Sequence, residues 1–427
     1  MGSRRIWDKG DDIDASMMRY TARDDWRWDQ RLLPFDLRAS AAHVRGLARV
    51  GVLDDEERTQ LVEALEHLGR RVEQGEMVLT PDDEDGHGAI EQALVSALGD
   101  VGKKVHTGRS RNDQVLVALR LYERDALDAL DDAAVTAASA LLDRADAETE
   151  TPMAGVTHLQ HAVPSTVGYW LGSIAAALAD GLVMLRAVRR LVNQSPLGGA
   201  AGYGVNLALD RAGIAAELDF DDITLSPLAD QGSRGVVEVQ VLTAAWHLMT
   251  AVRRLAWDVS LYTTPEFGFV ALDPALTTGS SIMPNKRNPD LVELMRAAPA
   301  VVQGAVTELM GVLSLPSGYH RDVQLTKAPT MRGLDEALAT LRLVPRLVAG
   351  ISLDRERLRQ SIDAGCYATD RAVELTAGGV PFRDAYRRVA DELDTLDGTP
   401  ETSLAARVSP GGAGRPELDR IRARLAR

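Results

Sequence analysis

The segment from residue 113 to residue 151 constrains the fold most, because it contains neither glycine nor proline. Its leucines recur at steps compatible with one apolar stripe along a helix. The leucines that define this stripe are Leu116, Leu119, Leu127, Leu130, Leu141 and Leu142. The segment therefore predicts one helix much longer than the usual length of about 11–12 residues. A helix of this length needs several neighbours to cover its apolar surface.

Further stretches with few helix breakers predict more long helices, over residues 165–195, 236–264 and 290–315. Aromatic residues make up only 4% of the chain, while alanine, leucine, arginine and acidic residues dominate. This composition favours helices over strands. We therefore expect an all-α fold with a central bundle of long helices. The lengths of the helices also favour association of subunits.

Glycines and prolines between the long segments predict three helical regions. An acidic, glycine-containing stretch over residues 80–88 and a turn over residues 99–108 separate an N-terminal helical domain, 1–105, from the central long-helix bundle, 106–355. Shorter segments with several glycines then predict a small C-terminal helical domain, 356–427. No internal repeat or long low-complexity tract is present.

Charge and cysteine content exclude several classes of partner. The chain has 48 basic and 62 acidic residues, a net charge of −14, and no basic stripe, so we expect neither nucleic acid nor an anionic membrane as a partner. Charged residues break the first twenty positions, which argues against a signal peptide, and no apolar run approaches the roughly 20 residues of a membrane span. With Cys366 as its one cysteine, the chain fits a soluble, cytoplasmic protein.

Three polar clusters interrupt the helical pattern, and the first is His106 to Gln114. Ser110 and Asp113 have the side chains of helix caps, and under that interpretation Arg109 and Arg111 simply lie in solvent. Alternatively, two guanidinium groups beside free helix-start amides form a carboxylate-binding site. Capping needs only one such residue, so the density of polar side chains favours the second interpretation.

The second cluster is Thr157 to His161, which precedes a helix predicted to start at Pro164. His158 and His161 are three residues apart, but no third ligand follows at a metal-binding spacing, so we expect no metal. Two interpretations stay open. The histidines either cap and pack at a helix entry, or His158 transfers protons while Thr157 and Gln160 hold it.

The third cluster, Thr277 to Pro289, contains two prolines and is predicted to be a loop. A linker rarely combines Ser280, Lys286 and Asn288, and we expect this loop to close over a substrate. No phosphate-binding lysine motif is present, and the glycines over residues 199–204 have the wrong spacing for a dinucleotide fingerprint. The acidic turn Asp82 to Asp85 is most simply a solvated turn.

These clusters carry a resemblance to the fumarase/aspartase superfamily of lyases, whose shared loop Gly-Ser-Ser-x-Met-Pro-x-Lys-x-Asn-Pro is similar to Gly279 to Pro289. Within the superfamily, His106 to Gln114 and Ser317 to Lys327 resemble segments of the argininosuccinate lyase family. Four further segments, 36–43, 84–91, 367–370 and 379–383, extend the resemblance over nearly the whole chain.

The resemblance implies a reversible, cofactor-free β-elimination that converts argininosuccinate to fumarate and L-arginine, the last step of arginine biosynthesis. It implies His158, Ser280 and Lys286 as catalytic residues, with either Ser280 or His158 taking the carbon-bound proton. The implied substrate-binding residues are Arg111, Asn112, Thr157, Asn288, Tyr319, Gln324 and Lys327. It also implies a homotetramer in which three subunits build each active site.

Two positions depart from the family pattern. The usual Ser-Asp-Arg-Asp loop is replaced here by Asp230 to Gly235, and Val163-Pro164 stands where Gln-Pro is usual. Two alternative functions remain: another fumarate-releasing lyase, of the adenylosuccinate lyase or fumarase type, and a non-catalytic, crystallin-like structural protein. The combined segments 106–114 and 317–327 argue against the first, and the presence of the catalytic residues argues against the second.

Overall fold

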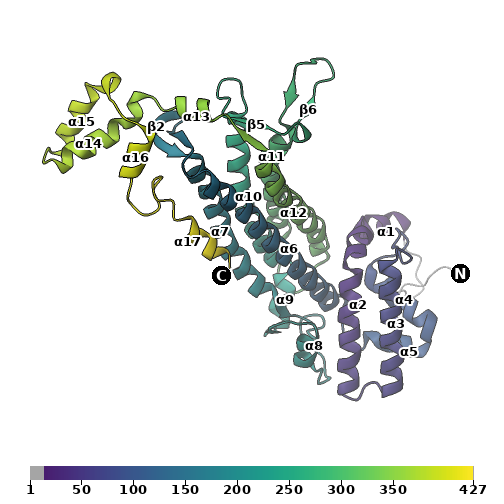
Figure 1. Ribbon diagram of the computed structural model, residues 1–427. Helices are drawn as coiled ribbons and strands as arrows, with labels where there is room; N and C mark the ends of the chain where they lie inside the picture. Colours follow the sequence, from purple (N-terminus) through teal and green to yellow (C-terminus); the bar gives the residue numbers. More distant parts are fainter. Residues whose placement is uncertain (1–13, 427) are drawn as a thin grey trace. The chain divides into compact units, whose positions relative to one another are not determined.

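The computed structural model describes residues 14–426, and in this range the chain forms 17 α-helices and eight short strands (Figure 1). The predicted long helices are present as α6 (Arg111–Ala147), α7 (Val167–Val192), α10 (Val236–Tyr262) and α11 (Asp290–Val312). A fifth, α12, covers Lys327–Ala349. The prediction of an all-α fold with long helices is therefore confirmed, whereas the boundaries at residues 105 and 355 stay predictions.

The chain divides into two compact units, which do not follow one another simply in sequence. The first comprises residues up to 129 together with 185–243 and 303–335, and the second comprises 130–184, 244–302 and 336 onward.

The first unit has an apolar core built by its N-terminal helices, and Figure 1 shows α2, α3 and α4 side by side. Leu33, Leu47, Leu61 and Leu94 are buried there. α3 begins with a capping box in which Asp54 accepts a hydrogen bond from the Glu57 backbone N at 2.8 Å, so the chain reverses sharply between α2 and α3. The other helices of this unit are α1 (Ala15–Ala22), α2 (Asp25–Arg49), α3 (Asp55–Glu73), α4 (Gly86–Leu98), α5 (Asp100–Lys103), α8 (Arg211–Glu217) and α9 (Pro227–Ser233). Its strands are β3 (Gln194–Ser195) and β4 (Asp222–Ile223).

The second unit contains most of α7 and the C-terminal helices. These are α13 (Arg355–Gln360), α14 (Ala368–Ala377), α15 (Phe382–Ala390), α16 (Pro400–Ala406) and α17 (Leu418–Leu425). Its strands form three two-stranded antiparallel sheets: β1 (Pro152–Thr157) with β2 (Gln160–Thr166), β5 (Val270–Leu272) with β8 (Ile351–Leu353), and β6 (Thr278–Gly279) with β7 (Arg287–Asn288).

The β1–β2 hairpin corrects one prediction, because Pro164 lies inside β2 and does not start a helix. His158 and Leu159 form its two-residue turn with φ angles of 56° and 58°. Two consecutive left-handed residues match the right-handed twist of a hairpin, although asparagine and glycine are the usual choices. The proline therefore did not mark the start of the helix, and α7 begins only at Val167.

One described helix, α7, is long and apolar enough to pass a membrane-span test by length and composition, contrary to the expectation that no segment would. In the structure 56% of its most apolar window is buried, as in the core helix of a bundle. The bent pair α9 and α10 passes only if the two helices are counted together. The signal-peptide prediction concerns residues 1–20, of which 1–13 lie outside the described residues.

Candidate functional site

A cavity of about 170 Å³ in the first unit is lined almost entirely by polar and charged side chains. Five of the predicted substrate-binding residues lie on it: Arg111, Asn112, Tyr319, Gln324 and Lys327. The other lining residues are Asp25, Asp29, Glu84, Asp85, His87, Val115, Arg234 and Arg321. The fold thus gathers residues from the starts of α2, α4 and α6 with the segment that precedes α12.

At the start of α6, the structure shows which residues of the first polar cluster stabilise the fold and which reach the cavity. Ser110 N donates to Asp113 at 2.8 Å, and the same carboxylate accepts hydrogen bonds from Gly198 N at 3.0 Å and Ala200 N at 2.9 Å. Arg109 is buried and donates to Ser40 Oγ at 2.9 Å. Asp113 and Arg109 therefore hold the fold together, and the carboxylate-binding interpretation is wrong for Arg109. Only Arg111 and Asn112 of this cluster reach the cavity.

Lys327 is 3% exposed and forms ion pairs with two carboxylates of α2, with Asp25 at 2.8 Å and with Asp29. Asp29 also accepts a hydrogen bond from Gly86 N at 2.9 Å, which links α2 to the start of α4. Burial alone would favour a neutral lysine, but the charges of Asp29 and Asp25 raise the pKa of Lys327 overall. Burial raises the pKa of Asp25. The lysine is therefore a fixed cation on the cavity wall.

Arg111 and Gln324 are held by partners that the sequence analysis did not identify. The Arg111 guanidinium lies 3.0 Å from the Asp85 carboxylate and 3.4 Å from that of Glu84. Both acidic side chains are largely buried, so the expectation of a solvated acidic turn is wrong for Glu84 and Asp85, whereas Asp82 is exposed. Gln324 Nε2 donates to the carbonyl oxygen of Thr21 at 2.9 Å. These contacts fix the orientation of the Arg111 and Gln324 side chains at the cavity.

Sequence reasoning assigned no role in the site to eight of the cavity residues, among them Asp25, Asp29, His87 and Arg234. Asp25 and Asp29 are four residues apart and therefore share one face of α2, which was an available signal. His87 lies in the segment 84–91 that carried part of the resemblance. Arg234 lies in the segment that departs from the family pattern, where no motif marked it.

His158 lies in the second unit on the exposed turn of the β1–β2 hairpin, and Thr157 directly precedes it. The neighbouring His161 contacts Asp363 at 2.8 Å from Nδ1 and is therefore occupied with a structural partner. That hydrogen bond lowers the pKa of Asp363. Of the two histidines of this cluster, His158 is the one at the tip of the hairpin.

Ser280, Lys286 and Asn288 lie on the predicted loop, which β6 and β7 close at its base through the pairs Thr278 with Asn288 and Gly279 with Arg287. Ser280 Oγ accepts a hydrogen bond from the Met283 backbone N at 3.0 Å, so a tight local turn holds the serine. Lys286 is exposed, and the Ile282 side chain at the loop tip is 83% exposed. The expected loop is therefore present, and few contacts hold its tip.

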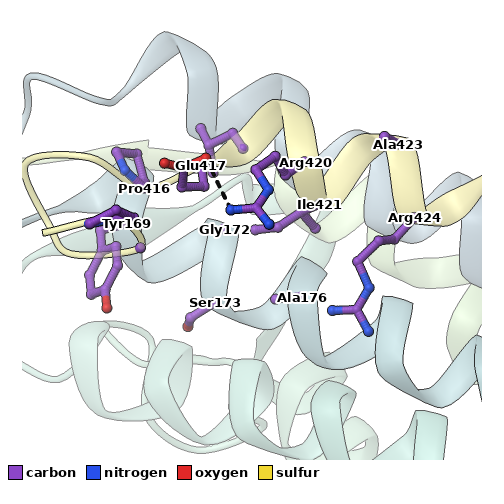
Figure 2. Close-up of a pocket in the computed structure, with 13 residues that line it drawn as sticks. Tyr169, Gly172, Ser173, Ala176, Pro416, Glu417, Arg420, Ile421, Ala423 and Arg424 are labelled. Atoms are coloured by element: carbon purple, nitrogen blue, oxygen red, sulfur yellow. Dashed lines mark ion pairs between the residues drawn. The ribbon is translucent and has the colours of Figure 1, made fainter.

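Two larger hollows occur in the second unit. Figure 2 shows the first, of about 550 Å³, between α7 residues Tyr169, Gly172, Ser173 and Ala176 and α17 residues such as Arg420 and Arg424. None of the predicted site residues lines it. The second, of about 690 Å³, includes Thr157 from the β1–β2 hairpin. Within residues 14–426, no three His, Cys, Asp or Glu side chains are grouped in a way that would hold a metal ion.

Comparisons with known proteins place the chain among lyases. A family model described as "Lyase" matches residues 9–304. The argininosuccinate lyase of Sorangium cellulosum is 62% identical over 426 residues, covering 100% of this chain and 99% of the relative. That of Stenotrophomonas maltophilia is 48% identical and covers 98% of each chain.

Solved structures with much lower sequence identity share the fold. EDDS lyase in complex with formate superposes with a TM-score of 0.81 at 23% identity, covering 97% of this chain and 90% of that one. A fumarate lyase from a Mesorhizobium species superposes with a TM-score of 0.71 at 20% identity, covering 97% of this chain and 98% of that one.

Proposed function

The chain belongs to the argininosuccinate lyase family, and we propose that it catalyses the reversible cleavage of argininosuccinate to fumarate and L-arginine. It is an enzyme of the lyase class. The observation that carries the proposal is the cavity of the first unit, because it gathers five residues that the family resemblance assigns to substrate binding.

The proposed chemistry begins with removal of a proton from the carbon next to a carboxylate. The resulting dianionic aci-carboxylate needs fixed cations and amide donors, and we assign this role to Lys286 and Asn288. Ser280 and His158 are the two proton-transfer groups: one takes the carbon-bound proton, and the other protonates the departing nitrogen as the carbon–nitrogen bond breaks. Thr157 and Asn112 bind the succinyl part of the substrate.

The proposed assembly is a homotetramer, with each active site built from three chains, and the proposed location is the cytoplasm. Long helices with apolar residues over much of their surface support the assembly. Light scattering at micromolar concentration tests it, and a stable, active monomer of about 46 kDa would refute the composite site.

The activity is tested by following fumarate absorbance after purified protein is mixed with argininosuccinate, adenylosuccinate or malate in parallel. We expect fumarate from argininosuccinate alone. Preference for adenylosuccinate or malate would assign the chain to another branch of the superfamily. Absence of turnover with every substrate would favour a crystallin-like structural role.

A further inference from the structure

Arg234 differs from the other cations of the 170 Å³ cavity because no described carboxylate forms an ion pair with it, although its charge acts on Asp25 and Glu123. Lys327 is paired with Asp25 and Asp29, and the remaining two cations, Arg111 and Arg321, both lie within 4 Å of Glu84. Arg234 is 3% exposed, and among residues 14–426 no ion pair or hydrogen bond reaches its guanidinium group. Within residues 14–426, Arg234 is therefore a buried cation on the cavity wall that no carboxylate contacts directly.

A charge in this position is costly to the folded protein unless a ligand satisfies it. Burial of an unpaired ion is strongly unfavourable, and buried guanidinium groups in proteins are normally paired. The charge of Arg234 acts on Asp25 and Glu123, but neither forms an ion pair with it: Asp25 is paired with Lys327 at 2.8 Å, and Glu123 accepts a hydrogen bond from Arg120 at 3.1 Å. Glu238 accepts from Gly235 N at 2.6 Å. Burial and the charge of Glu238 raise the pKa of Glu123 to about 8, which leaves it largely protonated near neutral pH.

The backbone that carries Arg234 is fixed on both sides. Arg234 lies at the break between α9 and α10, where Arg120 donates to Ser233 Oγ at 3.1 Å. Gly235 has a φ of 92°, and a Cβ atom there would collide with Leu313. The arginine is thus held at the cavity by neighbours that do not neutralise it. This is the arrangement of a preorganised anion-binding group.

A second donor on the same cavity lacks a partner. His87 is 9% exposed, its Nδ1 lies 2.5 Å from Asp36, and its Nε2 is buried with no hydrogen-bond partner among the described residues. Burial opposes protonation, but Asp36, with smaller contributions from Asp85 and Asp29, raises the pKa of His87 overall. The histidine is therefore able to donate from Nε2 to an anionic ligand.

We propose that Arg234, assisted by His87, binds the α-carboxylate of the arginine part of the substrate; this inference rests on the proposed function. The cavity wall carries Asp25, Asp29, Glu84 and Asp85 besides its cations. Such a mixed wall suits a zwitterionic amino acid, whose ammonium group needs acidic partners and whose carboxylate needs a cation. Neither residue belongs to the set that the family resemblance assigns.

The experiment measures binding of three probes to the full-length wild-type protein and to Arg234→Gln: L-arginine, agmatine, which lacks the carboxylate, and fumarate. Arg332→Gln is the matched control, because Arg332 is an exposed arginine paired with Glu308. We expect Arg234→Gln to weaken L-arginine binding by about ten- to hundredfold, as for loss of a charge-assisted hydrogen bond, and to leave agmatine and fumarate binding unchanged. The L-arginine affinity of Arg234→Lys should lie between those of the wild type and Arg234→Gln, because lysine keeps the charge but lacks the planar guanidinium group.

Thermal unfolding separates this role from a structural one. Since glutamine removes an unpaired buried charge, Arg234→Gln should unfold at the wild-type temperature or above it. A marked decrease in the unfolding temperature, or failure to fold, would make Arg234 a structural residue and overturn the inference.

Loss of fumarate binding with intact L-arginine binding would instead assign Arg234 to the succinyl end. If wild-type protein released no fumarate from argininosuccinate, the proposed function would fail; turnover with unchanged L-arginine affinity in Arg234→Gln would refute only this inference.

Discussion

The cavity of the first unit and the two polar loops of the second unit hold their functional side chains in opposite ways. Lys327 is buried between two carboxylates, whereas Lys286 lies exposed on a loop with few contacts. His87 is buried against Asp36, whereas His158 lies on an exposed hairpin turn. From this difference we propose that the cavity residues are in place before substrate arrives, while Ser280 and His158 depend on substrate or subunit association to be enclosed.

Replacing a lysine by methionine in each region tests this contrast, and we expect it to give the largest difference in stability. Lys327→Met leaves Asp25 and Asp29 buried without their cation, so we expect the free energy of unfolding to fall by about 3–5 kcal/mol. Lys286→Met, at an exposed loop position, should leave it within about 0.5 kcal/mol of wild type. Denaturant titration of both variants measures the difference, and equal stabilities would contradict the contrast.

The loop residues should affect turnover instead. Ser280→Ala, His158→Asn and Lys286→Met should each lower kcat by at least about a hundredfold, which corresponds to about 2.7 kcal/mol of transition-state stabilisation. Lys103→Met, which removes an exposed lysine paired with Asp100, is the matched control. Circular dichroism should show native helix content throughout. Loss of helix in His158→Asn would favour the structural interpretation of the histidine, and wild-type turnover in Ser280→Ala would restrict that serine to loop structure.

The buried carboxyl group of Glu123 gives the first unit a pH dependence that the exposed loops lack. The pKa of Glu123 is about 8 in the folded protein, above its ordinary value of 4.5, so the unfolded chain releases this proton at lower pH. Its contribution therefore makes stability fall as pH rises from about 4.5 to 8. Glu123→Gln should flatten this slope and stabilise the protein by about 1–2 kcal/mol at pH 8, within the range for replacing a buried charge by a neutral group.

Denaturation curves at several pH values measure the effect of Glu123→Gln. Glu308→Gln, at an exposed position on α11, should leave the slope unchanged. A slope in Glu123→Gln equal to that of wild type would show that this carboxyl group is ionised in the folded state.

Removal of metal ions should have the smallest effect. Lys286 and the fixed cations of the cavity supply the positive potential that a metal ion provides in other enzymes. Activity after prolonged chelator treatment should therefore equal that of untreated enzyme. Recovery of lost activity on addition of zinc or magnesium would reveal a metal site and contradict this account.

The long helices were predictable because their signals are local. Absence of glycine and proline, together with helical spacing of leucines, determines α6 without knowledge of its neighbours. The hairpin at His158 was not, because its turn uses left-handed backbone at residue types that rarely adopt it. The secondary structure of this segment is determined by the pairing of β1 with β2 and not by the conformational preferences of the turn residues.

Part of the candidate site was predictable from family resemblance and part only from the structure. Resemblance gave Lys327, but its partners Asp25 and Asp29 lie some three hundred positions away in the chain. Burial of Arg109 was also not predictable, because its partner Ser40 belongs to a distant helix. Ion pairs and hydrogen bonds between distant segments follow from tertiary packing, which no local pattern of residues encodes.

Calorimetric titration of argininosuccinate into Ser280→Ala tests the central claim that the cavity of the first unit supplies most of the substrate-binding groups, while the proposed proton-transfer groups lie on the loops of the second unit. With the first unit unaltered, the variant should bind the substrate with a dissociation constant within about tenfold of the wild-type KM, while releasing almost no fumarate. Loss of substrate binding in this variant, with native helix content and oligomeric state, would show that the loop itself supplies the binding energy and would contradict the account.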